Sequence, residues 1–479
     1  MTTKHQVAEA SGQYLADAAG QVVPVGYKQT EVGLIPNDWE FKFIGEIATV
    51  FSGGTPNRKM ADYWGGDIPW VTTTLIDGSE ITIVNEFITN KGLDSSAARW
   101  CKKGTILMAM YGQGKTRGKV AVLKFESTIN QACAAIELKN LSSNKFVLHV
   151  LNSMYEKIRD LSNSGGQENL SSGIIKNIGI PYPSNEEQTA IANALSDVDA
   201  LINELEKLIA KKQAIKTATM QQLLTGRTRL PEFRYHSKNV GWISDSASTV
   251  CSEVELVDAL SLIHPTTTTM PTDGTPKGYK PSELGEIPED WEVINLLDMV
   301  TLIHGKAHEP FVDETGLYIV VNSKFISSEG TVTKNCTRNE CCAQVGDVLM
   351  VLSDLPNGKA LAKCFHVVNE NIYAVNQRVC IYRTNQLDSK FLFYILNRHE
   401  YFLALDDGVT QTHILNGDIS ACKLFLPSLK IEQTAIATIL SDMDTEIQAL
   451  QQRLSKTRQI KQGMMQELLT GKTRLVRGA

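Results

Sequence analysis

Residues 109–116, Ala-Met-Tyr-Gly-Gln-Gly-Lys-Thr, form the segment of this sequence that most resembles a phosphate-binding loop. Such a loop lies between a strand and a helix, because the N-terminus of the helix faces the phosphate. Here an apolar strand precedes the loop, but Gly118 and a second apolar stretch, Val-Ala-Val-Leu at 120–123, follow it. The sequence therefore predicts the tip of a hairpin rather than a nucleotide site.

Other fragments of catalytic motifs are incomplete. Glu40-Phe41-Lys42 resembles part of the carboxylate and lysine set of metal-dependent nucleases. All fifteen prolines are isolated, which excludes the Asn/Asp-Pro-Pro-aromatic motif that holds a flipped adenine. The nine cysteines lack paired C-x-x-C spacing, and the clustered Cys336, Cys341 and Cys342 are predicted to be structural. We predict no catalytic residue, no metal site and no cofactor in this chain.

The hairpin tip suits contact with DNA better. Glutamine pairs with adenine in the major groove, arginine and lysine pair with guanine, and further cations hold phosphates. A solvated loop without function is the alternative, because short basic tips are common. The candidate DNA-binding residues of this tip are Tyr111, Gln113, Lys115, Thr116, Arg117 and Lys119.

Bulk composition fits a globular protein of two or three domains, with 479 residues, 42% hydrophobic and 21% charged. The first twenty residues lack a secretory signal, and no apolar run is long enough to span a membrane. Scattered cysteines are typical of reduced thiols in a cytoplasm. The net charge of −6 is unusual for a freestanding nucleic-acid binder, which is normally basic. A DNA-binding role therefore requires partners that supply positive charge.

An internal repeat organises the chain. Residues 26–40 recur at 278–292, residues 187–192 at 432–437, and residues 223–230 at 468–475. The middles, 41–180 and 293–425, share only sparse features such as Asn130-Gln131 with Asn376-Gln377. Matching ends and divergent middles indicate one frame that carries two different DNA-reading parts.

Each copy ends in a long predicted helix. Apolar residues recur at alternating spacings of four and three, which is the heptad pattern of a coiled coil. Asn185 is predicted to cap the first helix, and Gly226 and Gly471 to end the two helices. Lys211, Lys212 and Lys216 interrupt the apolar seam. The seam residues are Ile191, Leu195, Val198, Ile202, Leu205 and Ile209 in the first helix and Ile436, Leu440, Met443, Ile447, Leu450 and Leu454 in the second.

We predict an α+β fold with two tandem mixed α/β domains, each followed by its long helix. The helices pair as an antiparallel coiled-coil spacer with pseudo-twofold symmetry; helices folded back onto their own domains are the alternative. The middles predict strands at 105–108, 120–123 and 348–351, and helices at 146–161 and 391–405. The predicted parts are an N-terminal arm (1–25), a first target-recognition domain (26–184), a first helix (185–230), a connector (231–277), a second recognition domain (278–428) and a second helix (429–475).

These features together resemble the specificity subunits of Type I restriction–modification systems. The resemblance rests on the start of each copy, on Gly53-Gly54-Thr55-Pro56 and Asp67-Ile68-Pro69-Trp70, on Ile178-Gly179-Ile180-Pro181, and on the Leu-Leu-Thr-Gly-Arg/Lys-Thr-Arg-Leu ends. It covers about residues 26–230 and 278–475.

The resemblance implies a non-catalytic subunit in which each variable domain reads one half of a split double-stranded DNA target. It implies that the helices set the unread gap. It also implies two partner methyltransferase subunits that use S-adenosylmethionine to methylate adenine at N6, and motor-nuclease subunits that use ATP and Mg. A fused methyltransferase–nuclease fragment, or a coiled-coil interaction protein without a DNA role, are the alternatives.

Further candidate DNA-binding residues lie in other loops of both copies. In the first copy they are Thr55, Arg58, Lys59, Gln167 and Asn169. In the second copy they are Lys306, His308, Ser323, Lys324, Asn357, Lys359, Thr410, Gln411, Thr412 and His413.

Overall fold

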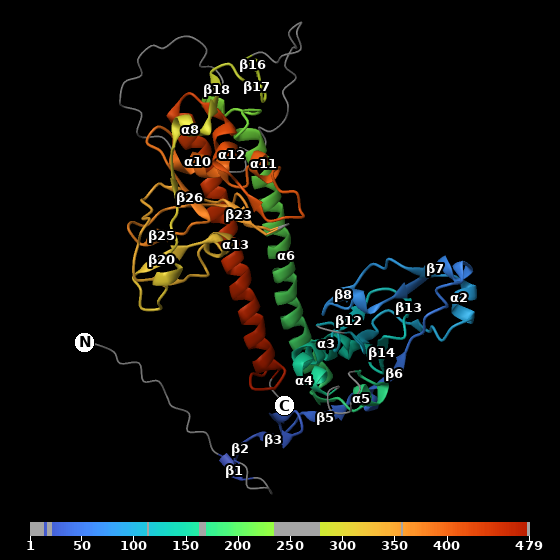
Figure 1. Cartoon of the computed structure of the whole chain (residues 1–479). Helices are drawn as coiled ribbons and strands as arrows, with labels where there is room; N and C mark the ends of the chain where they lie inside the picture. The colour runs from blue at the N-terminus through green and yellow to red at the C-terminus, as the bar shows by residue number, and fades with distance from the viewer. Residues whose placement is uncertain are drawn as a thin grey trace. The chain divides into compact units, whose positions relative to one another are not determined.

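The computed structural model of the chain describes residues 14–16, 22–112, 115–161, 169–233, 278–355 and 358–476. The chain forms two compact units (Figure 1). Unit 1 comprises residues 1–207 and 451–479, and unit 2 comprises residues 208–450. These units cross the predicted domain boundaries, because the second half of each long helix belongs to the unit that holds the other copy's recognition domain.

Unit 1 contains two mixed sheets, which two separate antiparallel strand pairs precede in the chain. The sheet orders are β6-β14-β11-β12-β8 and β10-β13-β7-β9. The elements are β1 (Tyr14–Ala16), β2 (Val22–Pro24), β3 (Tyr27–Thr30), β4 (Gly33–Pro36), β5 (Glu40–Phe43), α1 (Ile44–Ile47), β6 (Ala48–Ser52), β7 (Trp64–Val71), β8 (Glu80–Ile81), β9 (Phe87–Ile88), α2 (Asn90–Asp94), β10 (Trp100–Cys101), β11 (Ile106–Ala109), β12 (Val120–Leu123), β13 (Ser127–Ile129), β14 (Cys133–Leu138), α3 (Asn144–Ser153), α4 (Tyr155–Asp160), α5 (Ser172–Lys176), β15 (Gly179–Tyr182) and α6 (Asn185–Leu223).

Unit 2 repeats this plan. Its four-stranded sheet has the order β19-β26-β22-β24, which matches β6-β14-β11-β12 of unit 1, and its second sheet has the order β21-β20-β25. The divergent middles therefore share one topology. The elements are β16 (Tyr279–Ser282), β17 (Gly285–Pro288), β18 (Trp291–Asn295), α8 (Leu296–Met299), β19 (Thr301–His304), β20 (Tyr318–Val321), α9 (Ser323–Ser327), β21 (Asn335–Cys336), β22 (Val348–Val351), β23 (Ser353–Asp354), β24 (Cys364–His366), β25 (Tyr373–Val375), β26 (Val379–Arg383), α10 (Ser389–Leu396), α11 (Glu400–Leu403), β27 (Thr412–His413), α12 (Asn416–Ala421), β28 (Lys423–Pro427) and α13 (Lys430–Leu468).

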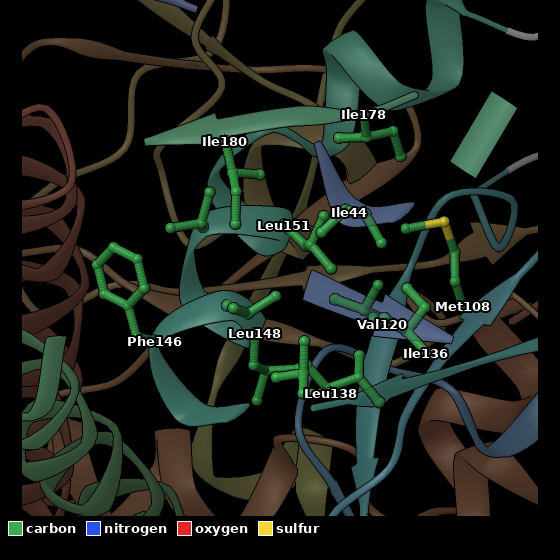
Figure 2. Close-up of a cluster of buried hydrophobic side chains, with 14 of the residues drawn as sticks. Ile44, Met108, Val120, Ile136, Leu138, Phe146, Leu148, Leu151, Ile178 and Ile180 are labelled. Carbon is green, nitrogen blue, oxygen red and sulfur yellow. The ribbon is translucent and has the colours of Figure 1, made fainter. Parts of the chain in front are cut away.

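The main core of unit 1 lies between α3 and the five-stranded sheet. Figure 2 shows Phe146 and Leu151 of α3 gathered with Met108, Val120 and Ile136 of the sheet strands. These side chains are completely buried, and burial of each contributes about 1.5–3 kcal/mol. The short apolar strands β11 and β12, buried at every position, thus hold the loop between them at the edge of this core.

The two long helices begin within one residue of the predicted starts, but they end at Leu223 and Leu468, before the predicted ends at 230 and 475, and the predicted cap of the first was wrong. Ser184, not Asn185, accepts a hydrogen bond from the N–H of Glu187, at 3.4 Å. The Gln188 side chain donates to the Pro183 carbonyl at 2.8 Å instead of closing a capping box. Gly226 and Gly471 follow the helices with φ of 69° and 71°, which confirms the predicted glycine ends.

Within each unit, segments of α6 and α13 lie antiparallel (Figure 1). In unit 1, Asp199 pairs with Lys461 at 2.5 Å, and Glu206 pairs with Arg458 at 2.6 Å. In unit 2, Lys212 pairs with Glu446 at 2.7 Å, and Lys216 pairs with Asp444. Two of the lysines that interrupt the seam therefore join the helices through ion pairs.

The predicted seam residues are all buried or half-buried, which is consistent with helix pairing. The outer ends of the seam also serve the domains. Ile191 and Leu195 belong to the core of unit 1, and Ile436 and Leu440 belong to the core of unit 2. Each long helix therefore packs against its own domain at its N-terminal end and contacts the other long helix further along.

The end of each copy packs against the start of the other copy. In unit 1, Arg474 donates to Asp38 at 2.7 and 3.0 Å and to Glu187 at 2.5 and 2.8 Å. In unit 2, Arg229 makes the same fork to Asp290 and Glu432 at 2.7–3.0 Å. Each unit combines the start of one copy with the end of the other. The near-identity of the repeat ends follows, because both units need the residues that make this contact.

Candidate nucleic-acid interface

In unit 1, three predicted DNA-binding loops converge near one turn, residues 130–132. Thr55 Oγ1 donates to Gln131 Oε1. The Met110 N–H, at the base of the hairpin tip, donates to the Ala132 carbonyl at 2.8 Å. The Met110 carbonyl in turn accepts from Leu170, next to Asn169, at 3.0 Å. One side-chain and two backbone hydrogen bonds therefore bring together loops that lie far apart in the sequence.

Unit 2 builds the same convergence around residues 376–378. The Lys306 N–H donates to the Val375 carbonyl at 2.9 Å, and the Leu352 N–H donates to the Arg378 carbonyl at 2.9 Å. The Leu352 carbonyl accepts from Ile414 at 2.8 Å. In addition β23 pairs with β27, which lays the loop that carries Lys359 beside residues 410–413.

The hairpin tip of unit 1 is confirmed as the connection between two antiparallel strands, β11 and β12. No helix follows the Gly-Lys-Thr sequence, so the resemblance to a phosphate-binding loop is superficial. Glu40 and Lys42 form an ion pair at 2.7 Å on β5, which pairs with β15. They belong to the frame.

Many of the predicted DNA-binding residues are exposed or half-exposed, and three lie outside the described residues: Gln113, Gln167 and Asn357. Their DNA-binding role stays a prediction. The accessible ones are Thr55, Arg58, Lys59, Tyr111, Lys115, Thr116, Lys119, Asn169, Lys306, Ser323, Lys324, Lys359, Thr410, Gln411 and His413.

Three predicted DNA-binding residues are buried, which disfavours direct contact. Arg117 is 7% exposed and Thr412 is 8% exposed, with Thr412 Oγ1 donating to Asp406 at 3.0 Å. His308 is fully buried: Nδ1 lies 2.7 Å from the Lys306 carbonyl, and Nε2 accepts from the Glu340 N–H at 3.0 Å. Both ring nitrogens of His308 are therefore occupied, and we correct its role to that of a structural residue.

In each unit, a side chain at the junction of two helices donates a hydrogen bond to a backbone carbonyl of the hairpin tip. In unit 1, Tyr155 Oη donates to the Lys115 carbonyl at 2.6 Å. In unit 2, Arg398 Nη1 donates to the Lys359 carbonyl at 3.3 Å and to the Leu361 carbonyl at 3.2 Å. Unrelated residue types thus fix the carbonyl of the candidate lysine in both units.

The sequence interpretation missed exposed polar residues at the turns themselves. Gln131 in unit 1, and Gln377 and Arg378 in unit 2, are exposed at the centre of the convergence. The recurrence of Asn-Gln in otherwise divergent middles was the signal that could have found them. Among the described residues, no group of three or more His, Cys, Asp or Glu side chains could hold a metal ion.

A profile of the family described as "Type I restriction modification DNA specificity domain" matches residues 36–217 and 288–458. The chain belongs to this family. Two curated relatives from Methanocaldococcus jannaschii are the specificity subunits of the type I restriction enzymes MjaIX and MjaVIII. The first is 36% identical over 186 residues, 38% of this chain and 42% of that protein. The second is 25% identical over 459 residues, 92% of this chain and 94% of that protein.

A solved structure, the S subunit of a Type-I restriction–modification system from M. genitalium, has the same fold. Its TM-score is 0.51 at 14% identity, over 90% of this chain and 96% of that one. The chain is accordingly a specificity subunit of a type I system, a non-catalytic family. Within the described ranges, no helix is long and apolar enough to cross a membrane.

Proposed function

We propose that this specificity subunit reads a split, asymmetric DNA target, with unit 1 reading one half and unit 2 the other. The observation that carries the proposal is the convergence of polar loops at the same topological place in both units. The frame is shared, while exposed side chains differ at matching places, such as Asn169 against His413. Different side chains on the same frame would select different bases.

The proposal includes partners. Two adenine-N6 methyltransferase subunits would bind the repeated frame and supply S-adenosylmethionine, and motor-nuclease subunits would supply ATP- and Mg-dependent cleavage. The net charge of −6 supports dependence on such partners, because phosphate neutralisation dominates DNA affinity. The α6 and α13 helices, of 39 residues each and about 58 Å long, would set the gap between the half-sites.

The test is to express this chain with its methyltransferase subunit and map every methylated adenine in the host genome. The expected result is one motif with two different halves and a fixed unread gap. The purified chain alone is expected to bind that motif much more weakly than the complex does. A continuous or palindromic motif, or tight binding that the methyltransferase does not change, would contradict the proposal.

A further inference from the structure

In each unit an exposed arginine near the converging loops lies over an aromatic ring. In unit 1 the Arg58 guanidinium lies 3.9 Å from the ring centroid of Trp64 and 4.8 Å from that of Trp70. In unit 2 the Arg338 guanidinium lies 5.0 Å from that of Phe311. The arginine follows the turn at Gly53 in unit 1, whereas in unit 2 the ring, Phe311, follows the matching turn at Gly305.

The setting of Arg58 is rigid. Trp64 and Trp70 pack edge to face with centroids 5.0 Å apart. Their indole N–H groups donate to carbonyls of the loop that carries Arg58, at Asn57 (3.2 Å) and Gly54 (2.9 Å). Arg58 also pairs with Glu86 at 2.5 Å, although its side chain stays 54% exposed. The guanidinium is thus held in place before any partner arrives.

The segment around Arg338 is tied to the central turn of unit 2. The Thr337 N–H donates to the Phe311 carbonyl at 2.9 Å. Two residues after Arg338, the Glu340 N–H donates to His308, whose own N–H donates to Asn376 Oδ1 at 3.3 Å. The buried His308 therefore connects the Arg338 segment to the turn at which the other loops meet.

We propose that Arg58 and Arg338 are the guanine-reading residues of the two half-sites, one in each. This rests on the proposed DNA-reading function. Arginine reads guanine by donating two parallel N–H groups to O6 and N7, which requires a fixed guanidinium plane. Stacking on an aromatic ring fixes that plane and reduces the entropy lost on binding. A phosphate contact has no such geometric requirement, because it depends mainly on charge.

The test uses the complex with the methyltransferase and the target identified by genome mapping. Each guanine of the target is replaced in turn by 7-deazaguanine, which lacks the N7 acceptor. For the unaltered complex we expect one position in each half-site at which Kd rises roughly 10-fold to 100-fold. Arg58→Lys should reduce the response at one of these positions and leave the other, because lysine can donate to guanine but lacks the planar fork that the ring holds in place. Arg338→Lys should do the reverse.

Lysine preserves the charge, so phosphate binding should persist in both variants. Arg453→Lys, an exposed arginine on α13, is the matched control and should change neither response. Equal weakening of all sequences by Arg58→Lys, or an unchanged analogue response in either variant, would overturn the inference. So would a half-site without guanine. Because a split target would still be found in those cases, the proposed function would stand; its own failure would show as the absence of any split target.

Discussion

His149 and Tyr394 occupy matching positions in the two units, and each faces an aspartate of a long helix. His149 Nδ1 lies 4.0 Å from Asp199 Oδ2, and Tyr394 Oη donates to Asp444 Oδ2 at 2.8 Å. Both aspartates also pair with a lysine of the other helix segment in the same unit. The two recognition domains thus contact the helices through matching positions, but only the contact in unit 1 contains a histidine.

The histidine makes the stability of unit 1 depend on pH. Burial lowers the pKa of His149 from 6.5 to about 4, against the opposing effect of Asp199. The folded chain therefore favours the neutral ring, so this contribution is complete above pH 6.5 and is lost as the pH falls toward 4. At about pH 5 the expected loss is about 2 kcal/mol of unfolding free energy.

His149→Tyr should reproduce the arrangement of unit 2 and remove that loss. Burial raises the pKa of Tyr394, so a tyrosine does not titrate in this range. The measurement is chemical unfolding of both proteins at several pH values. Burial also lowers the pKa of His366 and His399 in unit 2, so the readout is the difference between the two curves. If the unfolding free energy fell with pH equally in the original chain, His149→Tyr and His149→Gln, the prediction would be contradicted.

Replacement of Arg474 by methionine should destabilise unit 1 selectively. The Glu187 carboxylate that Arg474 pairs with is 2% exposed, and loss of one partner leaves a buried charge uncompensated. The expected cost is about 3–5 kcal/mol. Hydrogen exchange should quicken in residues 23–200 and not in the recognition domain of unit 2. Arg229→Met is the corresponding change in unit 2, where Glu432 is also buried. It should quicken hydrogen exchange in the recognition domain of unit 2 and not in that of unit 1.

Tyr155→Phe should reduce discrimination in one half-site without unfolding the domain. It removes only the hydroxyl that holds the Lys115 carbonyl, at a net cost of about 1 kcal/mol or less in stability. Since the loop carrying Lys115 becomes free to shift, mismatches in the half-site read by unit 1 should be accepted several-fold more readily. Arg398→Met, which removes the donor to the Lys359 carbonyl, is expected to reduce discrimination in the half-site read by unit 2. Methylation rates on a panel of mismatched targets measure both, and equal effects on the two halves would refute the assignment.

The helices and the hairpin tip could be predicted because local patterns determine them. The heptad spacing from Ile191 to Ile209 and the apolar runs on both sides of residues 109–119 are visible within short windows. The cap was mispredicted because Ser184 and Asn185 are both good capping residues and only backbone geometry chooses between them.

The features that the sequence did not predict depend on contacts between segments that lie far apart in the chain. His308 looked like a loop residue, but its burial depends on Glu340 and Asn376, which no local pattern connects to it. The division of each long helix between the two units could not be predicted for the same reason. The order of the chain suggests that each domain keeps its own helix, whereas Arg474 joins a segment more than four hundred residues earlier.

The glycines that end the two helices should be irreplaceable. At Gly471 the φ is +71°, and an added Cβ would lie 2.4 Å from Cγ of Pro36. Gly471→Ala therefore combines backbone strain with overpacking, and we expect a loss of about 2–4 kcal/mol in unfolding free energy. Gly463 offers the matched control, because it lies on the exposed face of α13 with nothing within 4 Å of an added Cβ.

Gly463→Ala should stabilise the chain by about 0.5–1 kcal/mol, since alanine restricts the unfolded chain and favours the helix. Urea denaturation of both variants measures the contrast, with Gly226→Ala as the counterpart in unit 2, where Pro288 Cδ lies 2.7 Å from the added Cβ. If Gly471→Ala were as well tolerated as Gly463→Ala, the close packing of the end of one copy against the start of the other would not be a requirement of the fold.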